Sequence, residues 1–256
     1  MTILSVCQDV AVELSQSVPA TLFTSTPSVF ARELRLHANR AAAAIVKAHD
    51  WQKLTALATL TGNGTDTAFD LPEDFDRMPV KARVHAGSDM NSNFREVKDL
   101  DQWIYLRDRG VGTTPGHWII LNGQMQFLPA IPNGQTAKFY YISNYAVRNQ
   151  AAVYQQKFAA DTDTFRLSEE LLALSIVWRW RAAKRVDFSI ELENFKLKLA
   201  EEIGRESGPK VLTVGRQRIP AQLAYDGTLG MPTGGSSYAP GDWDFSANNE
   251  PTFDEE

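Results

Sequence analysis

The strongest structural signal in the chain is the stretch His117-Trp118-Ile119-Ile120-Leu121-Asn122-Gly123-Gln124-Met125-Gln126-Phe127-Leu128. Two short apolar runs within it flank Asn122-Gly123, the residue pair that is preferred in a tight type I′ hairpin turn. The sequence therefore predicts an antiparallel β-hairpin at this point of the chain.

Further extended segments lie on both sides of the hairpin. Upstream, Leu71-Pro72-Glu73-Asp74-Phe75-Asp76-Arg77-Met78 contains a proline, which restricts the residue before it to an extended conformation. Pro79 to His85 alternates apolar and polar residues and predicts a half-buried strand. Downstream, Lys138-Phe139-Tyr140-Tyr141-Ile142 follows the turn signal Asn133-Gly134. Asp99 to Arg107 predicts one short helix, so we expect a meander of short antiparallel strands with a helix within it.

Helical periodicity precedes this β-rich block. Residues 3–17 place apolar side chains on one helical face. Ser28 is suited to cap the N-terminus of a second helix, which ends at His49-Asp50-Trp51. The small side chains of Ala41 to Ala44 predict a close contact between this helix and a neighbour.

Helical periodicity also follows the block. It returns from Thr164 and carries a broad apolar surface. Val186-Asp187-Phe188 predicts a break or bend, after which a further helix continues. Gly204 and Gly208-Pro209 predict its end.

These patterns predict an α+β fold. The expected architecture is an antiparallel helical bundle with an inserted antiparallel β-module and an extended C-terminal tail. We expect residues 1–50 and 155–208 to form the bundle, 51–154 the β-rich insert and 209–256 the tail. A chain of 256 residues suits one large domain with such an insert.

The tail differs from the rest of the chain in composition. After Arg218 it contains no Lys or Arg, while acidic residues accumulate. It is rich in Gly, Pro, Ser and Asn, so we expect it to be disordered when alone in water. Its spaced aromatics suit anchors for a partner surface, although they could instead fold back on their own domain. The aromatic candidates are Tyr225, Tyr238, Trp243 and Phe245.

The sequence contains no motif that binds a cofactor or a metal ion. The four histidines show no metal-ligand spacing, and Cys7 is the single cysteine. Gly110-Val111-Gly112 lacks the third glycine of a dinucleotide site, and no phosphate loop or nucleophile elbow occurs. We therefore expect no cofactor and no catalytic residue. The apolar runs are too short to cross a bilayer and no signal peptide is recognised, so we expect synthesis in a cytoplasm without membrane insertion.

Two groups in the β-rich block invite a functional interpretation. Paired carboxylates could cleave a glycoside, yet acids in a turn after proline usually accept hydrogen bonds from local amides. Clustered aromatics could bind sugar, yet in a small β-module they more often form the core. The acidic candidates are Glu73, Asp74 and Asp76. The aromatic candidates are Trp103, Trp118, Phe139, Tyr140 and Tyr141.

A basic group lies in the first helix after the β-rich block. It comprises Arg179, Arg181, Lys184 and Arg185. Three interpretations stay open for these residues. They could form a solvated helix face, contact an acidic protein neighbour, or contact passing nucleic acid.

The order of these elements resembles a known family. Two N-terminal helices end in Asp50-Trp51, and a Leu-Pro-x-Asp-Phe-x-Arg turn follows at residues 71–77. The Trp-Ile-Ile-Leu-Asn-Gly-Gln hairpin, a Phe-Tyr-Tyr strand and a long helix at 167–185 come next. This arrangement is similar to the head-to-tail adaptor proteins of short-tailed bacteriophages, also called connector, head completion or tail tubular proteins. The resemblance covers residues 1–205 and leaves out the C-terminal segment.

The resemblance implies a structural virion protein without enzymatic turnover. Such proteins form a ring, commonly of twelve copies, below the portal protein, and they dock tail tube or nozzle proteins. Double-stranded DNA passes through the ring, and the C-terminal segment reaches the portal. The net charge of −5 suits a channel that does not hold DNA. The alternatives are a carbohydrate-binding or glycan-hydrolysing virion protein that acts through the β-insert, and a cellular scaffold module.

Overall fold

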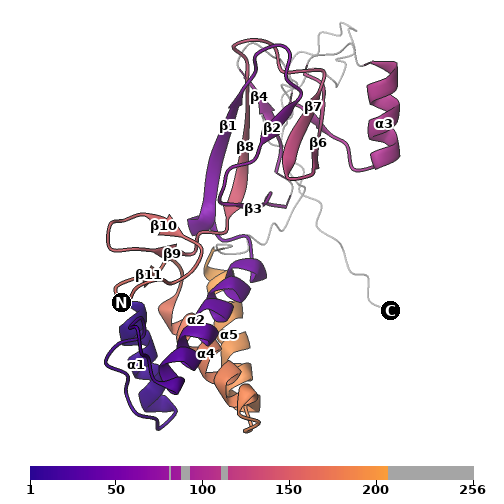
Figure 1. Cartoon of the computed structure of the whole chain (residues 1–256). Helices are drawn as coiled ribbons and strands as arrows, with labels where there is room; N and C mark the ends of the chain where they lie inside the picture. Colours follow the sequence, from indigo (N-terminus) through magenta and orange to yellow (C-terminus); the bar gives the residue numbers. More distant parts are fainter. Residues whose placement is uncertain (81, 88–92, 111–114, 207–256) are drawn as a thin grey trace, which may run out of the picture. The chain divides into compact units, whose positions relative to one another are not determined.

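The computed structural model describes residues 1–80, 82–87, 93–110 and 115–206. All of them belong to one unit, Met1–Pro209. Helices and mixed sheets both occur, so the fold is α+β, as predicted (Figure 1). The predicted tail at 209–256, with its aromatic candidates, lies outside the described residues.

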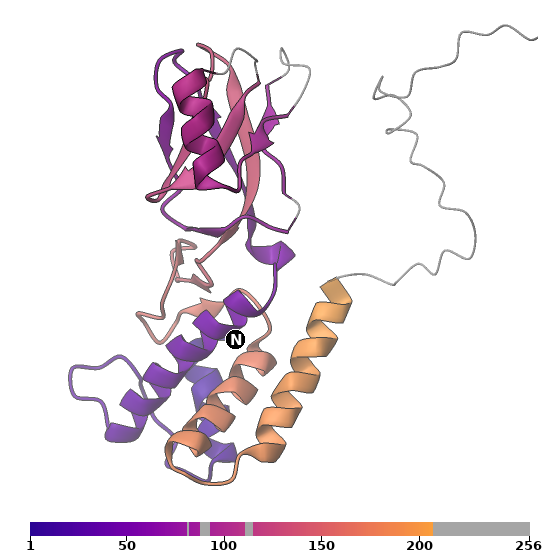
Figure 2. The same cartoon turned by 90° about the vertical axis from the view of Figure 1, so that its right-hand side faces the viewer.

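Four helices share one hydrophobic core. Three of them pack against α4, and Figure 2 shows α4 between α2 and α5. The core includes Leu34, Ile45, Leu171 and Ile176, all fully buried. The four helices are α1 (Ile3–Glu13), α2 (Val29–Ala48), α4 (Glu169–Ala183) and α5 (Ser189–Glu206).

Side-chain caps set where these helices begin. The hydroxyl of Ser28 accepts a hydrogen bond from the backbone N–H of Ala31, which confirms the predicted cap of α2. Ser168 caps α4 in the same way. Ala41 and Ala42 are buried in the shared core, while Ala43 is exposed. The predicted small-residue contact therefore involves the first two alanines.

A small three-stranded sheet packs with the helices. Its strand order is β10-β9-β11, and Val147 and Phe165 from it belong to the helical core. Asp161 lies between β10 and β11 and connects this loop to the segment between α1 and α2. Its carboxylate accepts hydrogen bonds from the N–H groups of Leu22 and Phe23 at 2.8 and 3.2 Å. The strands are β9 (Val147–Arg148), β10 (Tyr154–Gln155) and β11 (Thr164–Phe165).

The β-module lies between residues 55 and 143 and has its own core. Phe127, Phe139 and Met125 are fully buried there. One sheet contains β1 (Thr55–Thr61), β8 (Thr136–Ser143), β3 (Phe75–Arg77) and β4 (His85–Ala86). The other contains β2 (Ala68–Asp70), β7 (Gln124–Leu128), β6 (His117–Leu121) and β5 (Arg95–Glu96). A 3-10 turn at Gln52–Leu54 precedes β1, and α3 (Leu100–Arg109) packs on the second sheet through Trp103.

The predicted hairpin is confirmed. Strands β6 and β7 pair antiparallel, and Leu121 lies opposite Gln124. Asn122 and Gly123 have φ angles of 52° and 75°, the left-handed values that a type I′ turn requires at both positions. The predicted short helix is also present as α3, with Asp99 as its N-cap.

Two predictions about the β-module are wrong. Strands β5 and β6 pair in parallel, so the module is not wholly antiparallel. The reason is that α3 lies between them in the chain and provides the crossover that parallel strands need. The strand predicted for Pro79 to His85 is present only at its end, because the N–H of Val80 donates to the Asp50 carboxylate instead of a sheet neighbour. Val80 is 82% exposed, whereas Val84 forms an isolated antiparallel bridge with Phe94 and β4 begins at His85.

Three predicted helix boundaries also need correction. The first helix stops at Glu13, because Ser15 adopts a positive φ of 55°. The return of helix at Thr164 is wrong, since Thr164–Phe165 form β11 and α4 starts at Glu169. Gly204 does not end the last helix, because α5 continues to Glu206, and Gly208-Pro209 lies outside the described residues. The predicted break at 186–188 separates α4 from α5 and is confirmed.

Replacing Gly123 by Val tests the turn. We expect a loss of stability on the order of 1–3 kcal/mol, because a β-branched residue resists the positive φ at this position. A Cβ at Gly123 would meet nothing within 4 Å, so the backbone conformation alone causes the loss. Thermal denaturation followed by circular dichroism measures it.

The matched control is Gly204→Ala. A Cβ at Gly204 also meets nothing, but Gly204 lies in a helix, so this variant should gain about 0.5–1 kcal/mol. Equal melting temperatures for Gly123→Val and the unmodified chain would mean that the turn tolerates a branched residue.

Candidate functional site

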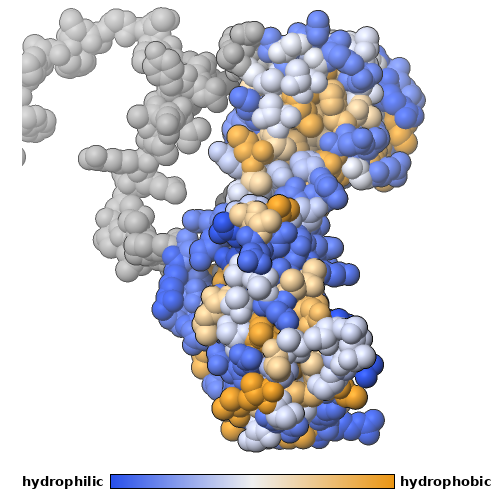
Figure 3. Space-filling view, turned by 60° about the vertical axis from the view of Figure 1, so that its left-hand side comes forward, coloured by the Kyte–Doolittle hydropathy of each residue, from blue (hydrophilic) through white to orange (hydrophobic). Residues whose placement is uncertain are grey.

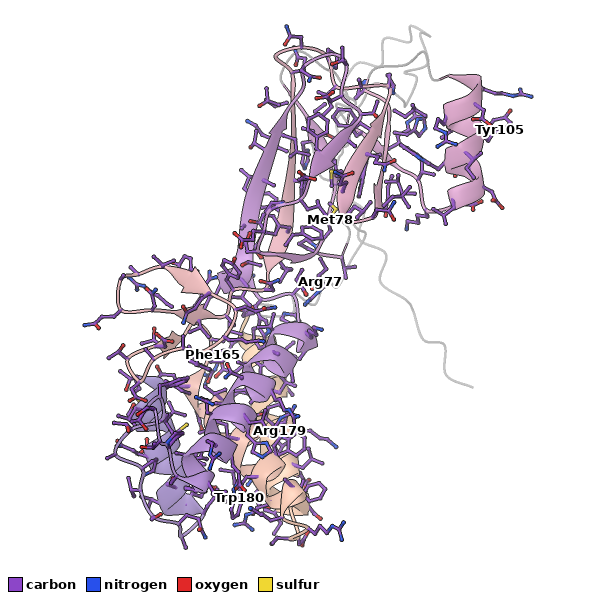
Figure 4. All side chains as sticks on the ribbon, in the orientation of Figure 1. Arg77, Met78, Tyr105, Phe165, Arg179 and Trp180 are labelled. Carbon is purple, nitrogen blue, oxygen red and sulfur yellow. The ribbon has the colours of Figure 1, made fainter. Side chains whose placement is uncertain are left out.

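The junction between α2 and the β-module is built around Arg77. This residue ends β3, and its guanidinium reaches the last turn of α2 (Figure 4). It donates to the carbonyls of Val46 and His49 at 3.2 and 2.8 Å and to the carboxylate of Asp50 at 2.9 Å. The last carbonyls of a helix lack partners within the helix and carry partial negative charge. Arg77 therefore caps α2 from the β-module.

The acidic residues beside Arg77 have structural partners. Asp76 forms an ion pair with Arg77, and burial together with the charge of Glu73 raises the pKa of Tyr145. The Asp74 carboxylate accepts a hydrogen bond of 2.7 Å from the Tyr141 hydroxyl. Burial and this carboxylate raise the pKa of Tyr141. These contacts favour the local hydrogen-bonding interpretation of the three acids over glycoside cleavage.

A second arginine holds the other side of the junction. The Arg166 guanidinium donates to the carbonyls of Tyr145 and Lys53 at 2.7 and 2.6 Å. It also lies 4.1 Å from the ring centre of Tyr154. Lys53 precedes β1 and Tyr145 follows β8, so Arg166 connects the chain where it enters and leaves the β-module.

The end of α5 lies at the same junction. The N–H of Gln52 donates to the Glu206 carboxylate at 3.0 Å, and its side-chain amide donates to the Glu206 carbonyl at 3.1 Å. His49 lies 3.9 Å from the same carboxylate. The last described residue is therefore fixed beside the C-terminal end of α2.

Most of the predicted basic group is engaged within the chain. Arg181 pairs with Glu191 at 2.8 Å, and Lys184 pairs with Glu33 at 2.7 Å. The remaining two differ in their surroundings: Arg179 donates to the Ser175 hydroxyl and lies over the Trp178 ring, while Arg185 is exposed in the turn after α4. The structure thus does not bring the four residues together as one free patch, and their contact with protein or DNA stays a prediction.

The proposed sugar platform is mostly interior. Trp103, Trp118, Phe139 and Tyr141 are buried, and Tyr140 alone of the five is exposed. These aromatics form the cores of the β-module, as the alternative interpretation expected. Among the described residues there is no group of three or more His, Cys, Asp or Glu that could hold a metal ion. No described helix is long and apolar enough to cross a membrane.

A recess of about 740 Å³ lies beside the junction in the β-module. Arg77, Met78 and Val80 form one wall, and Leu100 and Ile120 contribute to the others. Val80 and Leu100 are exposed, so the recess is open to solvent and mainly apolar. Figure 3 shows one face of the molecule, on which hydrophobic residues occur in small groups among hydrophilic ones.

A basic face on α2 was not predicted from the sequence. A groove of about 410 Å³ follows this helix, and none of its described lining residues is acidic. Its four cations are Arg32, Arg35, Arg40 and Lys157. The signal was present in the sequence, because Arg35 and Arg40 follow Arg32 by three and eight residues, spacings that keep both near Arg32 on a helix.

Replacing Arg77 by Met tests the junction. The variant should lose about 1.5–3 kcal/mol of stability, because charged hydrogen bonds to Asp50 and the last turn of α2 disappear. Chemical denaturation measures the loss, and hydrogen exchange of the amides at 46–50 locates it.

The control is Arg107→Met in α3, where the arginine is 63% exposed and pairs only weakly with Asp108. Its effect should stay below about 0.5 kcal/mol. If both variants unfolded alike, Arg77 would contribute no more than a surface arginine.

The contacts of Glu33 predict how the stability of the chain depends on pH. Hydrogen bonds from Lys184 and Trp180 lower the pKa of Glu33 from its ordinary value of 4.5. Its contribution to stability is therefore complete above pH 4.5 and is lost as the pH falls through the lower folded value. We expect the unmodified chain to lose more stability on acidification below pH 4.5 than Glu33→Gln.

Denaturation curves between neutral pH and the acid range measure this difference. Lys184→Met removes the main partner and should flatten the pH dependence in the same way. Parallel pH profiles for all three proteins would contradict a role for this contact in acid stability.

Sequence comparisons identify the family. A model of the SU10 adaptor protein family matches residues 1–220, which is most of the 256-residue chain. No curated protein matches the chain. The family match includes both arginines of the junction, the basic face of α2 and all the described elements. The chain therefore belongs to the SU10 adaptor protein family, in keeping with a structural head-to-tail adaptor of a bacteriophage.

Proposed function

We propose that the chain forms a ring below the portal of the virion, docks tail components and leaves a channel for DNA. The observation that carries this proposal is the family match over residues 1–220. The copy number of twelve comes from the resemblance of the sequence to head-to-tail adaptors. The protein would be synthesised in the host cytoplasm and would act in the virion without catalytic turnover.

The junction supports a structural role. An adaptor has to hold the partners on its two sides in a fixed relation, so its own parts need a stiff connection. Arg77 and Arg166 supply charged hydrogen bonds where the β-module meets the helices. Such bonds are stronger and more directional than neutral ones. In this proposal the helices form the wall of the ring, and the β-module projects outward or toward the tail.

The C-terminal segment at 209–256 is the proposed contact with the portal or with a neighbouring subunit. It follows closely after Glu206, which is fixed at the junction. Its composition gives it little to bury by itself, so it would order only against a partner. Tyr225, Tyr238, Trp243 and Phe245 would provide most of the affinity, while the acidic residues would steer association and fix the register.

The charge of the chain suits the passage of DNA. Contacts between cations and phosphates bind DNA and would slow its movement through a channel. The formal net charge of −5 favours weak contacts. Two of the four basic residues in the Arg179–Arg185 group, Arg181 and Lys184, are ion-paired within the chain, which also reduces the free positive charge.

Removing residues 209–256 tests the proposed docking. The truncated chain should keep its helices and β-module, because the described elements end before this segment. It should no longer co-sediment with portal rings of the same phage. Circular dichroism checks the fold, and sedimentation checks the binding.

A variant with alanine at the four aromatic positions separates anchoring from mere length. It should bind portals more weakly than the full chain although it keeps every acidic residue of the segment. Unchanged affinity of the truncated chain would exclude the segment as the docking element.

A further inference from the structure

Two helices present apolar rows to solvent. On α2, Val29 and Leu36 are 65% and 48% exposed, and Ala43 continues the row. On α5, Ile190 and Leu197 are 68% and 64% exposed. Residues seven apart lie on one line along a helix, which is the spacing used when two helices pack side by side. No residue of α5 is fully buried, so one side of this helix lacks a partner among the residues that the structure describes.

The charges beside the two rows have opposite signs. Leu36 and Ala43 line the groove of about 410 Å³ whose four charged residues are all basic. Leu197 lines a groove of about 360 Å³ on α5, where Glu170 and Glu201 contribute carboxylates. Lys198 also lines this second groove and is shared by both carboxylates, at 2.7 Å from Glu170 and 3.3 Å from Glu201, and Glu201 pairs with Arg205 as well. Carboxylates therefore outnumber cations in this groove, although both are ion-paired. Glu193 is exposed four residues before Leu197 and adds to the acidic side.

Among the described residues, no carboxylate forms an ion pair with Arg32, Arg35 or Arg40 of α2. Arg40 lies close enough to Arg179 and His37 to lower the pKa of both, after the larger effect of their burial. Like charges that repel one another in the single chain would be relieved by carboxylates brought from outside. The basic face of α2 therefore favours an acidic surface as its partner.

The two rows run in the same direction and at the same level. Glu33, near the start of α2, pairs with Lys184 after the end of α4, and Glu191, near the start of α5, pairs with Arg181. At the opposite end, Glu206 of α5 contacts Gln52 just beyond α2. The starts of α2 and α5 therefore lie together at one end of α4, and their ends lie together at the other. Figure 2 shows α2 and α5 on opposite sides of α4.

We propose that the basic α2 face of one copy docks on the acidic α5 face of the next copy. The α2 face comprises Val29, Arg32, Arg35, Leu36, Arg40 and Ala43. The α5 face comprises Ile190, Glu193, Leu197 and Glu201. This inference deepens the proposed function, because it rests on a ring and assigns the surfaces that close it. Different surfaces on the two sides of each copy give a heterologous contact, the type that builds closed rings.

The apolar rows would supply the area that is removed from water, and the flanking charges would select the partner face. A helix pair with apolar residues at the centre and opposite charges at its edges discriminates strongly between orientations. Docking of two α2 faces, or of two α5 faces, would bring like charges together. The contact is therefore directional, and each copy retains one free face until the ring closes.

Cysteine cross-linking tests the assignment of faces. Leu36→Cys and Leu197→Cys are prepared separately in the full-length chain and assembled with the portal protein of the same phage. Both leucines are exposed, so the fold should tolerate either change. The native Cys7 does not compete, because burial raises the pKa of its thiol to about 12. Circular dichroism confirms that each variant is folded before oxidation.

The mixture of the two variants should give a disulfide-linked dimer that neither variant gives alone. A chain that carries both cysteines should give a ladder of linked copies up to the full ring. Dimers from one variant alone would show that like faces meet and would overturn the proposal. Rings that form in electron micrographs but yield no linked dimer from the mixture would overturn it while leaving the proposed function intact. If no rings form, the proposed function fails first, and this inference fails with it.

Charge reversal gives an independent test. Arg32→Glu with Arg40→Glu should abolish assembly, and so should Glu193→Arg with Glu201→Arg. A mixture of these two double variants should assemble again, because every contact in an alternating ring then joins opposite charges. The control is Arg107→Glu in α3, which lies in the β-module and not in either helix face. Arg107 is exposed, and this control should assemble normally. Assembly of both double variants alone, or no recovery in the mixture, would contradict the charge pairing.

Discussion

The guanidinium of Arg77 in the last turn of α2 is the contact on which the rest of the junction depends. Asp50 accepts from Arg77 through one oxygen and from the Val80 N–H through the other. The same pair of contacts therefore caps the end of the helix and holds Val80 outside the sheet, which the chain rejoins at β4. As a result, Val80 lies at the open recess of the β-module instead of in a strand. A single charge pair thus fixes a helix end, a strand end and the shape of the nearby surface.

The inner contacts of the helical part differ from its outer faces in how their charges are paired. Charges of α4 that lie toward α2 and α5 are neutralised within the chain, as in the pairs Lys184–Glu33 and Arg181–Glu191. Charges on the outer side of α2 carry one sign and have no carboxylate in their groove. A charge that is satisfied internally gains little from a partner, whereas an uncompensated group gains more. The predicted contact with an acidic protein neighbour therefore fits α2 better than the basic group of α4.

The sequence predicted the features that depend on neighbouring residues. Asn122-Gly123 specifies its own turn, and Ser28 caps the helix that follows it. It failed where a distant group decides the conformation, as when Asp50 captures the N–H of Val80. The basic face of α2 was missed for a different reason. Adjacent cations such as Lys184 and Arg185 draw attention in a sequence, yet they lie at the C-cap of α4 and in the turn after it. Arg32 and Arg35 are three residues apart in α2 and share one side of that helix.

The two proposed faces also bear on the DNA channel. A basic helix that lined a channel would bind phosphates and retain DNA. If α2 of one copy lies on α5 of the next, its arginines face carboxylates and are withdrawn from the channel. The rest of the helical part and the β-module are then close to electrical balance, because residues 1–206 carry 23 Lys and Arg against 24 Asp and Glu, and most of the net charge of −5 lies in the segment after them. The same contact would thus close the ring and remove from the channel wall the cations most able to hold DNA. This link makes the assembly of the ring and the free passage of DNA consequences of one interface.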